Sequence, residues 1–180
     1  MRIYVMRHGT TVWNEKFIIQ GRSNNRLSSN GKILVEEAAK KYNNVKFDII
    51  FSSPLMRTMQ TANIMNKYHN VKVVKDDRLI EVDQGIFTRR EKSSLTHEEN
   101  MLRKSKDESY GMEKFENVYL RTKNFIDDLK ANYKYKNVLV VTHNVNASYI
   151  NCIFKCIKTN FDNREHSHCF NNAEIRCYEI

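Results

Sequence analysis

Short apolar runs recur along the chain, separated by longer segments in which apolar residues return every three or four positions. Three of the runs, Arg2–Met6, Phe47–Phe51 and Asn137–Thr142, are rich in β-branched residues and show no regular polar alternation. Such runs are typical of strands in a parallel sheet that is covered on both faces. Two more strands are predicted over Val71–Lys75 and Ala173–Ile180.

Helical periodicity fills the intervals between these strands. The predicted helices span Gly31–Tyr42, Leu55–Tyr68, Phe115–Tyr133 and Asn146–Ile157. Strands that alternate with helices favour a three-layer α/β/α sandwich around a mainly parallel sheet. One proline, five glycines and no internal repeat leave no flexible linker, so residues 1–180 are expected to form a single domain.

Charged and nucleophilic residues stand where the predicted strands end. Arg7 and His8 follow the first strand, His143 follows the strand Asn137–Thr142, and Arg57 lies early in the helix after Phe47–Phe51. Ligands of open α/β sheets bind at the carboxyl ends of the strands, where helix N-termini also favour anions. The sequence therefore predicts one site that contains two histidines and two arginines.

This set of side chains is suited to phosphoryl transfer. Two arginines can chelate phosphate oxygens, and a neutral imidazole can attack phosphorus and carry the phosphoryl group. A second histidine, if protonated, would stabilise charge in the transition state. The leaving oxygen needs a proton, for which Glu81 and Asp83 are both candidates. The arginines supply the positive charge, so we expect no metal and no cofactor.

The formal net charge of +9 arises from lysines and arginines spread over most of the chain. A nucleic-acid site would concentrate them and intersperse aromatic residues, so we expect no nucleic-acid partner. No apolar run reaches the length of a membrane span, and residues 1–9 (MRIYVMRHG) lack the features of a signal peptide. We therefore expect a cytoplasmic protein with no membrane contact, either a monomer or a homodimer.

Four cysteines lie in the last thirty residues, which is not the framework of a small secreted fold. Cys152 and Cys156 could bind a metal together with His166, His168 or Cys169. Their spacing is not the tight C-x-x-C that is usual for zinc, and their aliphatic neighbours favour buried thiols. We therefore predict no metal site here.

Residues 7–14 (RHGTTVWN) resemble the RHGxTxxN signature of the histidine phosphatase, or phosphoglycerate mutase-like, superfamily. Other segments match this family in the same order over nearly the whole chain. They are residues 20–31 (QGRSNNRLSSNG), 52–62 (SSPLMRTMQTA), 79–85 (LIEVDQG), 140–143 (VVTH) and 172–173 (NA). One such motif would be weak evidence, but several in order are specific.

The resemblance implies a phosphoglycerate mutase-like fold and a role for each matching residue. His8 would be the phosphorylated nucleophile, and Glu81 would protonate the leaving group and later activate water. The other residues expected at the catalytic phosphate pocket are Arg7, Arg57 and His143. The additional residues expected to bind the phosphate or the substrate are Asn14, Gln20, Gly21 and Asn144.

The chain also departs from the family pattern. Asn144 and Val145 replace the usual Gly-Gly after His143, and their side chains should narrow the space beside the phosphate. Residues 24, 26 and 28 differ too, although none of these three positions carries the chemistry. Residues 87–89 are a further change, on the substrate side. Substrate specificity is expected to reside in a variable segment over the pocket, at about residues 86–119.

Three functions remain open. The first is a metal-independent phosphatase that hydrolyses a small phosphomonoester metabolite through a phosphohistidine. The second is a 2,3-bisphosphoglycerate-dependent phosphoglycerate mutase that uses the same pocket. The mutase is disfavoured because Thr10 follows Gly9 and the segment Arg89–Glu113 is short. The third is a non-catalytic scaffold or polyanion-binding protein, which would be expected to have lost part of the site.

Overall fold

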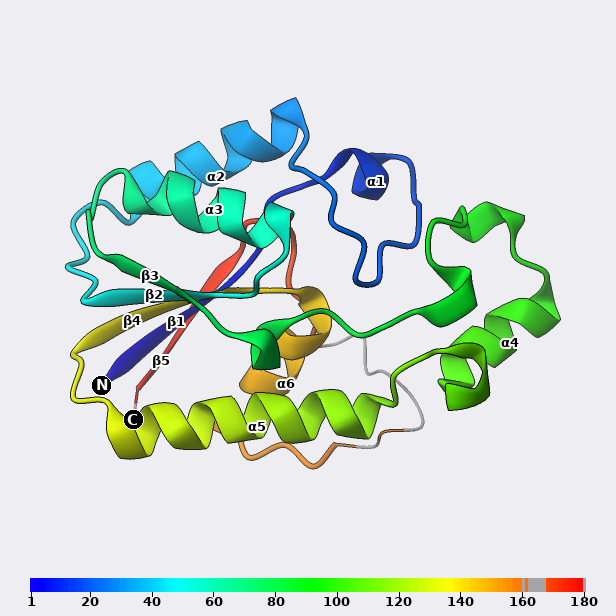
Figure 1. The fold of residues 1–180 in the computed structure, drawn as a ribbon. Helices are drawn as coiled ribbons and strands as arrows, with labels where there is room; N and C mark the ends of the chain where they lie inside the picture. The colour runs from blue at the N-terminus through cyan, green and yellow to red at the C-terminus, as the bar shows by residue number, and fades with distance from the viewer. Residues whose placement is uncertain (160, 162–167, 180) are drawn as a thin grey trace.

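The computed structural model describes residues 1–159, 161 and 168–179. Within them the strands form one sheet in the order β3-β2-β4-β1-β5 (Figure 1). The neighbours β1–β4, β4–β2 and β2–β3 run parallel, whereas β5 runs antiparallel to β1. The strands are β1 (Arg2–Arg7), β2 (Ile49–Ser52), β3 (Lys72–Lys75), β4 (Asn137–Thr142) and β5 (Ile175–Glu179). The prediction of a mainly parallel sheet is confirmed.

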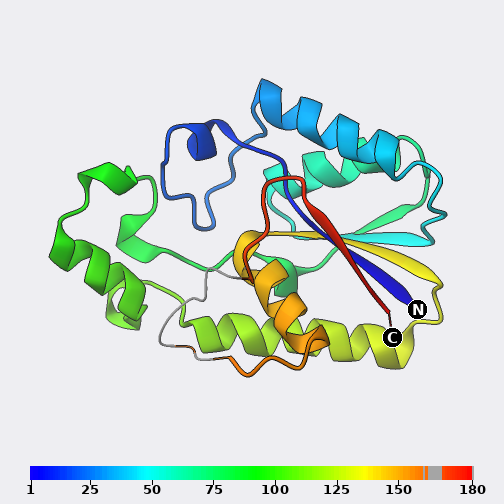
Figure 2. The same cartoon turned by 180° about the vertical axis from the view of Figure 1, so that it is seen from behind.

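Helices cover both faces of this sheet. Figures 1 and 2 show α2 and α3 on one face and α5 and α6 on the other, so the three-layer prediction is also confirmed. The α-helices are α1 (Val12–Glu15), α2 (Ser29–Lys41), α3 (Met56–Asn66), α4 (His97–Ser105), α5 (Phe115–Asn132) and α6 (Asn144–Phe154). The short 3₁₀ helices are η1 (Asp77–Leu79), η2 (Gly85–Phe87), η3 (Lys92–Ser94) and η4 (Glu108–Tyr110).

Successive residues of β1 pack into opposite layers. Ile3 and Val5 join the cluster formed with α5 and α6, whereas Tyr4 and Met6 join the cluster formed with α2 and α3. Side chains alternate across a strand, so a strand that is covered on both faces must be apolar at every position. Each fully buried aliphatic side chain contributes about 1.5–3 kcal/mol relative to an exposed one.

The observed strands differ from the predicted ones by at most two residues at either end. Helix α6 begins two residues earlier than predicted, because His143 has an extended backbone and caps it at Asn144. Helices α1 and α4 were not predicted. Each begins with a capping box, between Thr11 and Asn14 in α1 and between Thr96 and Glu99 in α4.

Residues 86–119 contain η3, α4 and η4 and lie beyond the carboxyl ends of the parallel strands, next to α1 (Figure 1). The loop that follows α1 pairs with this segment. The Ile19 amide donates to the Arg90 carbonyl at 2.9 Å, and the Arg89 amide donates to the Ile19 carbonyl at 2.8 Å. Ile19, Phe87, Leu95 and Met112 form a small core of their own. The segment is thus packed at the end of the sheet where the site was predicted.

Candidate active site

A cavity of about 160 Å³ opens where β1, β4 and the N-terminus of α3 meet. It is lined by nearly all of the site residues predicted from the sequence, with the sole exception of His143. The predicted residues in its wall are Arg7, His8, Asn14, Gln20, Gly21, Arg57, Glu81 and Asn144. Residues that are distant in the sequence are brought together because parallel strands place their carboxyl ends at one edge of the sheet.

The His8 ring has a defined tautomer. Its Nδ1 lies 2.7 Å from the carbonyl oxygen of Gly9, and a carbonyl can only accept a hydrogen bond. Nδ1 therefore carries the proton, and the Nε2 atom keeps its lone pair. Burial, together with the positive charges of Arg57 and Arg7, lowers the pKa of His8 well below the usual 6.5. The ring is consequently neutral at neutral pH, as a nucleophile must be.

The Arg57 side chain is buried at the second residue of α3 and is 1% exposed. Its guanidinium donates to the carbonyls of Ser23 (2.7 Å) and Gly21 (2.9 Å) and to Oδ1 of Asn25 (2.9 Å). Burial lowers the pKa of Arg57 to about 10, so the group still carries its positive charge at neutral pH. Arg57 therefore brings charge to the cavity and holds residues 21–25 against α3.

The same loop caps α3 from outside the helix. Leu55, at the N-cap position, offers no side-chain hydrogen bond, and Asn24 Oδ1 instead accepts from the Met56 amide at 2.6 Å. Asn24 is one of the positions that depart from the family pattern. Its amide oxygen supplies the capping interaction that the start of α3 would otherwise lack.

Arg7 reaches the cavity from the end of β1. One of its terminal nitrogens donates to the carbonyl oxygen of Phe170 at 2.6 Å. The turn before β5 also holds the neighbouring backbone, because Asn172 Nδ2 donates to the His8 carbonyl at 3.0 Å. The Ala173 amide donates to the Arg7 carbonyl at 3.1 Å. The last of the matching family segments, residues 172–173, is therefore in direct contact with the backbone of the proposed nucleophile.

His143 lies behind His8 and does not form part of the cavity wall. It is fully buried, and its ring meets that of His8 edge to face, with centroids 5.2 Å apart. Its Nε2 is 2.8 Å from the Ser53 hydroxyl oxygen. Burial and the nearby Arg57 charge lower the pKa of His143 well below 6.5. Both effects favour a neutral His143 ring in the ligand-free site.

The structure separates the two candidate carboxylates. Glu81 lines the cavity, and its Oε1 accepts from the Val82 amide at 3.0 Å. Asp83 is not among the lining residues. Its Oδ1 accepts from the Gly85 amide at 2.9 Å, and its Oδ2 lies 3.8 Å from Arg22 Nε. Geometry therefore favours Glu81 as the acid of the site.

Two amide side chains have their oxygens occupied by the protein. Asn14 Oδ1 accepts from the Thr11 amide at 3.1 Å, and Gln20 Oε1 accepts from Asn25 Nδ2 at 2.8 Å. Their NH₂ groups are the parts left to donate to a ligand. Asn144 Oδ1 likewise accepts from the Phe170 amide at 3.0 Å.

Gly21 needs to be a glycine. Its φ of +47° lies in the left-handed region, and a Cβ atom there would stand 2.9 Å from the Thr88 hydroxyl oxygen. The residue also presents its carbonyl to Arg57. A side chain at this position would displace the loop that forms part of the cavity wall.

Several residues of the cavity wall were missed at the sequence level. Lys92 and Arg103 come from η3 and α4, and Gln84 precedes η2. Lys92 and Arg103 lie outside the family motifs, and Gln84 is a position of residues 79–85 to which the resemblance gave no role. The capping box of α4 (T-x-x-E) was a usable signal for the helix and would have placed Arg103 on it. The other wall residues that were not predicted to bind are Ile18, Ile19, Val82 and Val145.

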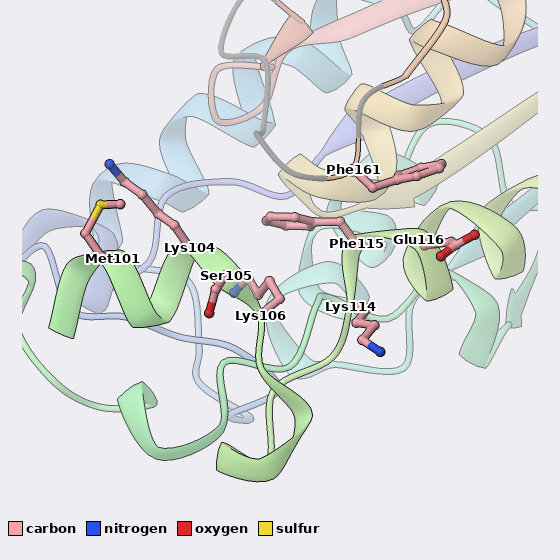
Figure 3. Close-up of a pocket in the computed structure, with 8 residues that line it drawn as sticks. All are labelled: Met101, Lys104, Ser105, Lys106, Lys114, Phe115, Glu116 and Phe161. Atoms are coloured by element: carbon pink, nitrogen blue, oxygen red, sulfur yellow. The ribbon is translucent and has the colours of Figure 1, made fainter. Parts of the chain in front are cut away.

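A second cavity, of about 550 Å³, lies between α4 and the start of α5 and contains none of the predicted site residues. Figure 3 shows Phe115 beside it, with Lys104 and Met101 on the flank formed by α4. Lys106 also lines this cavity, and its ammonium donates to Gln84 Oε1 at 2.6 Å. Because Gln84 lines the smaller cavity, the two spaces share one hydrogen-bonded pair in their wall.

Among the residues that the structure describes, no group of three or more histidines, cysteines and carboxylates is placed to hold a metal. Cys152 is buried as expected, whereas Cys156 is exposed, so the prediction of two buried thiols is wrong for Cys156. It follows the end of α6 at a left-handed turn with φ of 52°. His166, one of the three further candidate ligands, lies outside the described residues.

None of the described helices has the length and the apolar character that crossing a membrane requires.

Comparison with known proteins connects this geometry to a family. Residues 3–180 match the model of the histidine phosphatase superfamily (branch 1). The chain is 31% identical to phosphoserine phosphatase 1 of Hydrogenobacter thermophilus over 156 residues, which are 81% of this chain and 72% of that protein. It is 36% identical to the probable phosphoglycerate mutase GpmB of Proteus mirabilis over 105 residues, which are 58% of this chain and 49% of that protein.

Solved structures show the same fold. A mycobacterial glucosyl-3-phosphoglycerate phosphatase in complex with VO3 superposes with a TM-score of 0.84 and 22% identity, covering 98% of this chain and 91% of that one. The α-ribazole phosphatase of Shigella flexneri superposes with a TM-score of 0.85 and 21% identity, covering 100% of this chain and 91% of that one. The predicted phosphoglycerate mutase-like fold is confirmed by the likeness to a Bacillus anthracis phosphoglycerate mutase, with a TM-score of 0.78 and 22% identity over 98% of this chain and 86% of that one.

Proposed function

This chain belongs to the histidine phosphatase superfamily (branch 1), and on that premise we propose that it is a metal-independent phosphatase that hydrolyses a small phosphomonoester through a phosphohistidine at His8. The observation that carries the proposal is the bond from His8 Nδ1 to the Gly9 carbonyl. It leaves Nε2 unprotonated in a residue that lines a cavity with two arginines. An oriented imidazole beside an anion pocket is the arrangement that nucleophilic attack on phosphorus requires.

The first step transfers the phosphoryl group to the enzyme. The Nε2 lone pair of His8 attacks phosphorus, and the bond between phosphorus and the leaving oxygen breaks. Glu81 gives its proton to that oxygen, which departs as an alcohol. Arg7 and Arg57 balance the charge of the three equatorial oxygens during transfer.

The second step returns the enzyme to its starting state. Glu81, now a carboxylate, removes a proton from a water molecule, and the oxygen of that water attacks the phosphohistidine. The bond between Nε2 and phosphorus breaks, inorganic phosphate leaves, and Glu81 holds the proton for the next cycle. One carboxylic acid thus serves both steps, as microscopic reversibility demands.

A metal is not needed in this scheme because side chains supply the charge. Arg57 is protonated at neutral pH despite its burial, and Arg7 reaches the same cavity from β1. Lys92 and Arg103 add basic groups to the wall. A phosphomonoester carries about two negative charges near neutral pH, which these cations can match.

The substrate is a small phosphorylated metabolite. A cavity of about 160 Å³ is below the usual range of roughly 300–1,000 Å³ for drug-sized ligands. We infer that residues 1–180 act as a single catalytic domain and that residues 86–119 cover the bound substrate. The support for this covering role is that Lys92 and Arg103, both in the segment, line the cavity.

The likeness to proteins that are named as phosphoglycerate mutases favours a mutase as the second candidate. Both reactions begin with a phosphohistidine, but a mutase returns the phosphoryl group to an organic acceptor, whereas a phosphatase gives it to water. The test is a phosphate-release screen over sugar phosphates, phosphoglycerates, nucleotides and phosphoserine, with His8→Ala as the blank. Release of inorganic phosphate that depends on His8 supports the phosphatase. Interconversion of phosphoglycerates without phosphate release supports the mutase.

A further inference from the structure

We propose that Ser53 is a positioning residue that fixes the tautomer of His143. In this assignment the Ser53 hydroxyl donates to Nε2 of His143, so the neutral ring carries its proton on Nδ1 and can donate it to the transferring phosphoryl group. The inference rests on the proposed function, because it names a donor for the same reaction. It offers a neutral donor in place of the imidazolium that the sequence analysis considered for His143.

The hydrogen-bonding capacity of Ser53 sets the direction of this bond. Ser53 follows β2, is fully buried, and its Oγ lies 2.8 Å from His143 Nε2. Oγ also accepts, at 3.4 Å, from the Leu55 amide. A buried hydroxyl needs an acceptor for its proton. In the described part of the chain, the acceptor that the structure offers this hydroxyl is His143 Nε2.

The proton on the imidazole then has only one position left. If Nε2 accepts from Ser53, a neutral ring must carry its hydrogen on Nδ1. This Nδ1 is buried and has no hydrogen-bond partner among the described residues. Buried donors in native proteins are nearly always paired. An unpaired donor on a ring that contacts His8 is available to a phosphoryl group that His8 carries.

The surrounding charges favour a neutral donor. The groups that act on His143 are Arg57 on α3, Arg7 on β1, His8 directly after β1, and Arg121 on α5. The three arginines are cations, and they oppose a positive charge on the buried ring. A neutral Nδ1–H donor avoids this repulsion and still presents a hydrogen to the phosphoryl oxygens.

The wild-type protein provides a direct test without any substitution. Long-range ¹H–¹⁵N correlation spectra at pH 7.5 distinguish the two neutral tautomers and the imidazolium, with the His143 signals assigned by their loss in His143→Gln. We expect the Nδ1–H tautomer in the free enzyme and a shift of its Nδ1 signal when vanadate binds. An Nε2–H tautomer or an imidazolium in the free enzyme would overturn the inference.

Variants separate the tautomer from the fold. In Ser53→Ala we expect the Nδ1–H tautomer to lose its dominance and kcat to fall by about 10- to 100-fold, with KM little changed. The loss is smaller than the roughly 10²–10³-fold cost of deleting a transition-state donor outright, because part of the population keeps the correct tautomer. Ser53→Thr keeps a hydroxyl and should restore both the tautomer and most of kcat.

Ser52→Ala is the matched control. Ser52 is equally buried and adjacent, but its hydroxyl donates to the Ser53 carbonyl at 2.9 Å and does not reach His143. Its variant should lose thermal stability as Ser53→Ala does, yet keep the Nδ1–H tautomer and kcat. Equal losses of kcat in the two variants would show a packing effect and overturn the inference.

The spectra also keep this inference distinct from the proposed function. If the wild type releases no phosphate from any substrate, the phosphatase proposal fails, whereas the tautomer is still read directly. If the enzyme is an active phosphatase whose His143 is an Nε2–H imidazole, only the role of Ser53 fails.

Discussion

The imidazole rings of His8 and His143 meet edge to face, with centroids 5.2 Å apart and 62° between their planes. Burial is the main reason that the pKa of each lies well below 6.5, and the charges of Arg57 and Arg7 act in the same direction. The folded protein therefore keeps two neutral imidazoles in contact. A neutral ring is the state that an attacking nitrogen needs, and it makes the stability of the fold depend on pH.

The free energy of unfolding should fall as pH decreases below 6.5. The native pKa values of His8 and His143 are lowered, so the unfolded chain binds protons that the native protein does not. The stabilisation that comes from keeping these two histidines neutral is complete above pH 6.5. Below pH 6.5 the free energy of unfolding falls by up to about 1.4 kcal/mol per pH unit for each histidine. Urea denaturation between pH 7.5 and 5.5 measures this slope. His143→Gln removes one of the two histidines, so the slope should correspond to the uptake of one proton fewer on unfolding. An unchanged slope in that variant would contradict the lowered pKa of His143.

Replacing His8 with alanine should abolish turnover, because it removes the oriented imidazole that attacks phosphorus, and His8 is the one histidine among the described cavity residues. In the wild type, rapid quenching without acid should trap an acid-labile, base-stable phosphoenzyme at His8. His69→Ala is the control, since His69 packs on Phe47 and does not line the cavity. Activity of His8→Ala above a few per cent of the wild type would remove the basis of the mechanism.

Glu81→Gln should slow alkyl and aryl phosphates unequally. An alkoxide leaving group needs the proton, so phosphorylation of the enzyme by an alkyl phosphate should slow by about 10²–10⁴-fold. For p-nitrophenyl phosphate the first step should slow much less, and the remaining defect should lie in hydrolysis of the phosphohistidine.

Asp83→Asn is the matched variant for this experiment. Asp83 lies two residues further along the same loop, and its carboxylate is engaged by the Gly85 amide and Arg22. Asp83→Asn should lower the free energy of unfolding and leave the ratio of alkyl to aryl rates unchanged. If Glu81→Gln slows both substrates equally in single-turnover phosphorylation, Glu81 is not the acid.

Exhaustive chelation should leave the rate of phosphate release unchanged, because arginines supply the charge that a metal would otherwise provide. Vanadate and inorganic phosphate should inhibit competitively by occupying the same cavity. Steady-state assays with and without EDTA, after dialysis against metal-free buffer, make the comparison. Loss of activity that one divalent ion restores would show that a metal takes part.

Arg57→Lys should reduce kcat/KM by about 10²–10³-fold for alkyl and aryl substrates alike. A lysine retains the charge, but one ammonium cannot reproduce the planar fork that reaches Gly21, Ser23 and Asn25 at once. The loop of residues 21–25 should also loosen, which limited proteolysis or amide exchange can report. A variant that keeps wild-type activity with a protected loop would show that charge alone is needed.

The sheet and the position of the site could be predicted because burial on two faces leaves a strong signal. Every residue of β4 from Val138 to Thr142 is buried, so the sequence there is an unbroken apolar run that ends in a buried threonine. The histidines and arginines of the site could be identified because they come directly after the ends of such strands or early in the next helix. Tertiary packing and sequence pattern agree at these positions, so prediction from the pattern succeeds.

The remaining parts depend on contacts that leave no pattern. No residue of α4 is buried, so apolar periodicity is absent and a local capping box starts the helix. The residues alone left Glu81 and Asp83 open because both are carboxylates in one short loop, and only the family resemblance preferred Glu81. The structure favours Glu81 because Asp83 accepts from the backbone amide of Gly85, a glycine with a left-handed φ of 51°.

The position of β1 affects when the site can form during synthesis. β1 pairs with β4 on one side and β5 on the other, and the backbone of Arg7 and His8 is held by Asn172 and Ala173. These partners are made more than a hundred residues after the nucleophile. A nascent chain that has just left the ribosome with His8 exposed therefore has no site, and contacts between such distant segments slow folding. Phosphoryl chemistry would therefore begin only once β4 and β5 have both emerged and paired with β1.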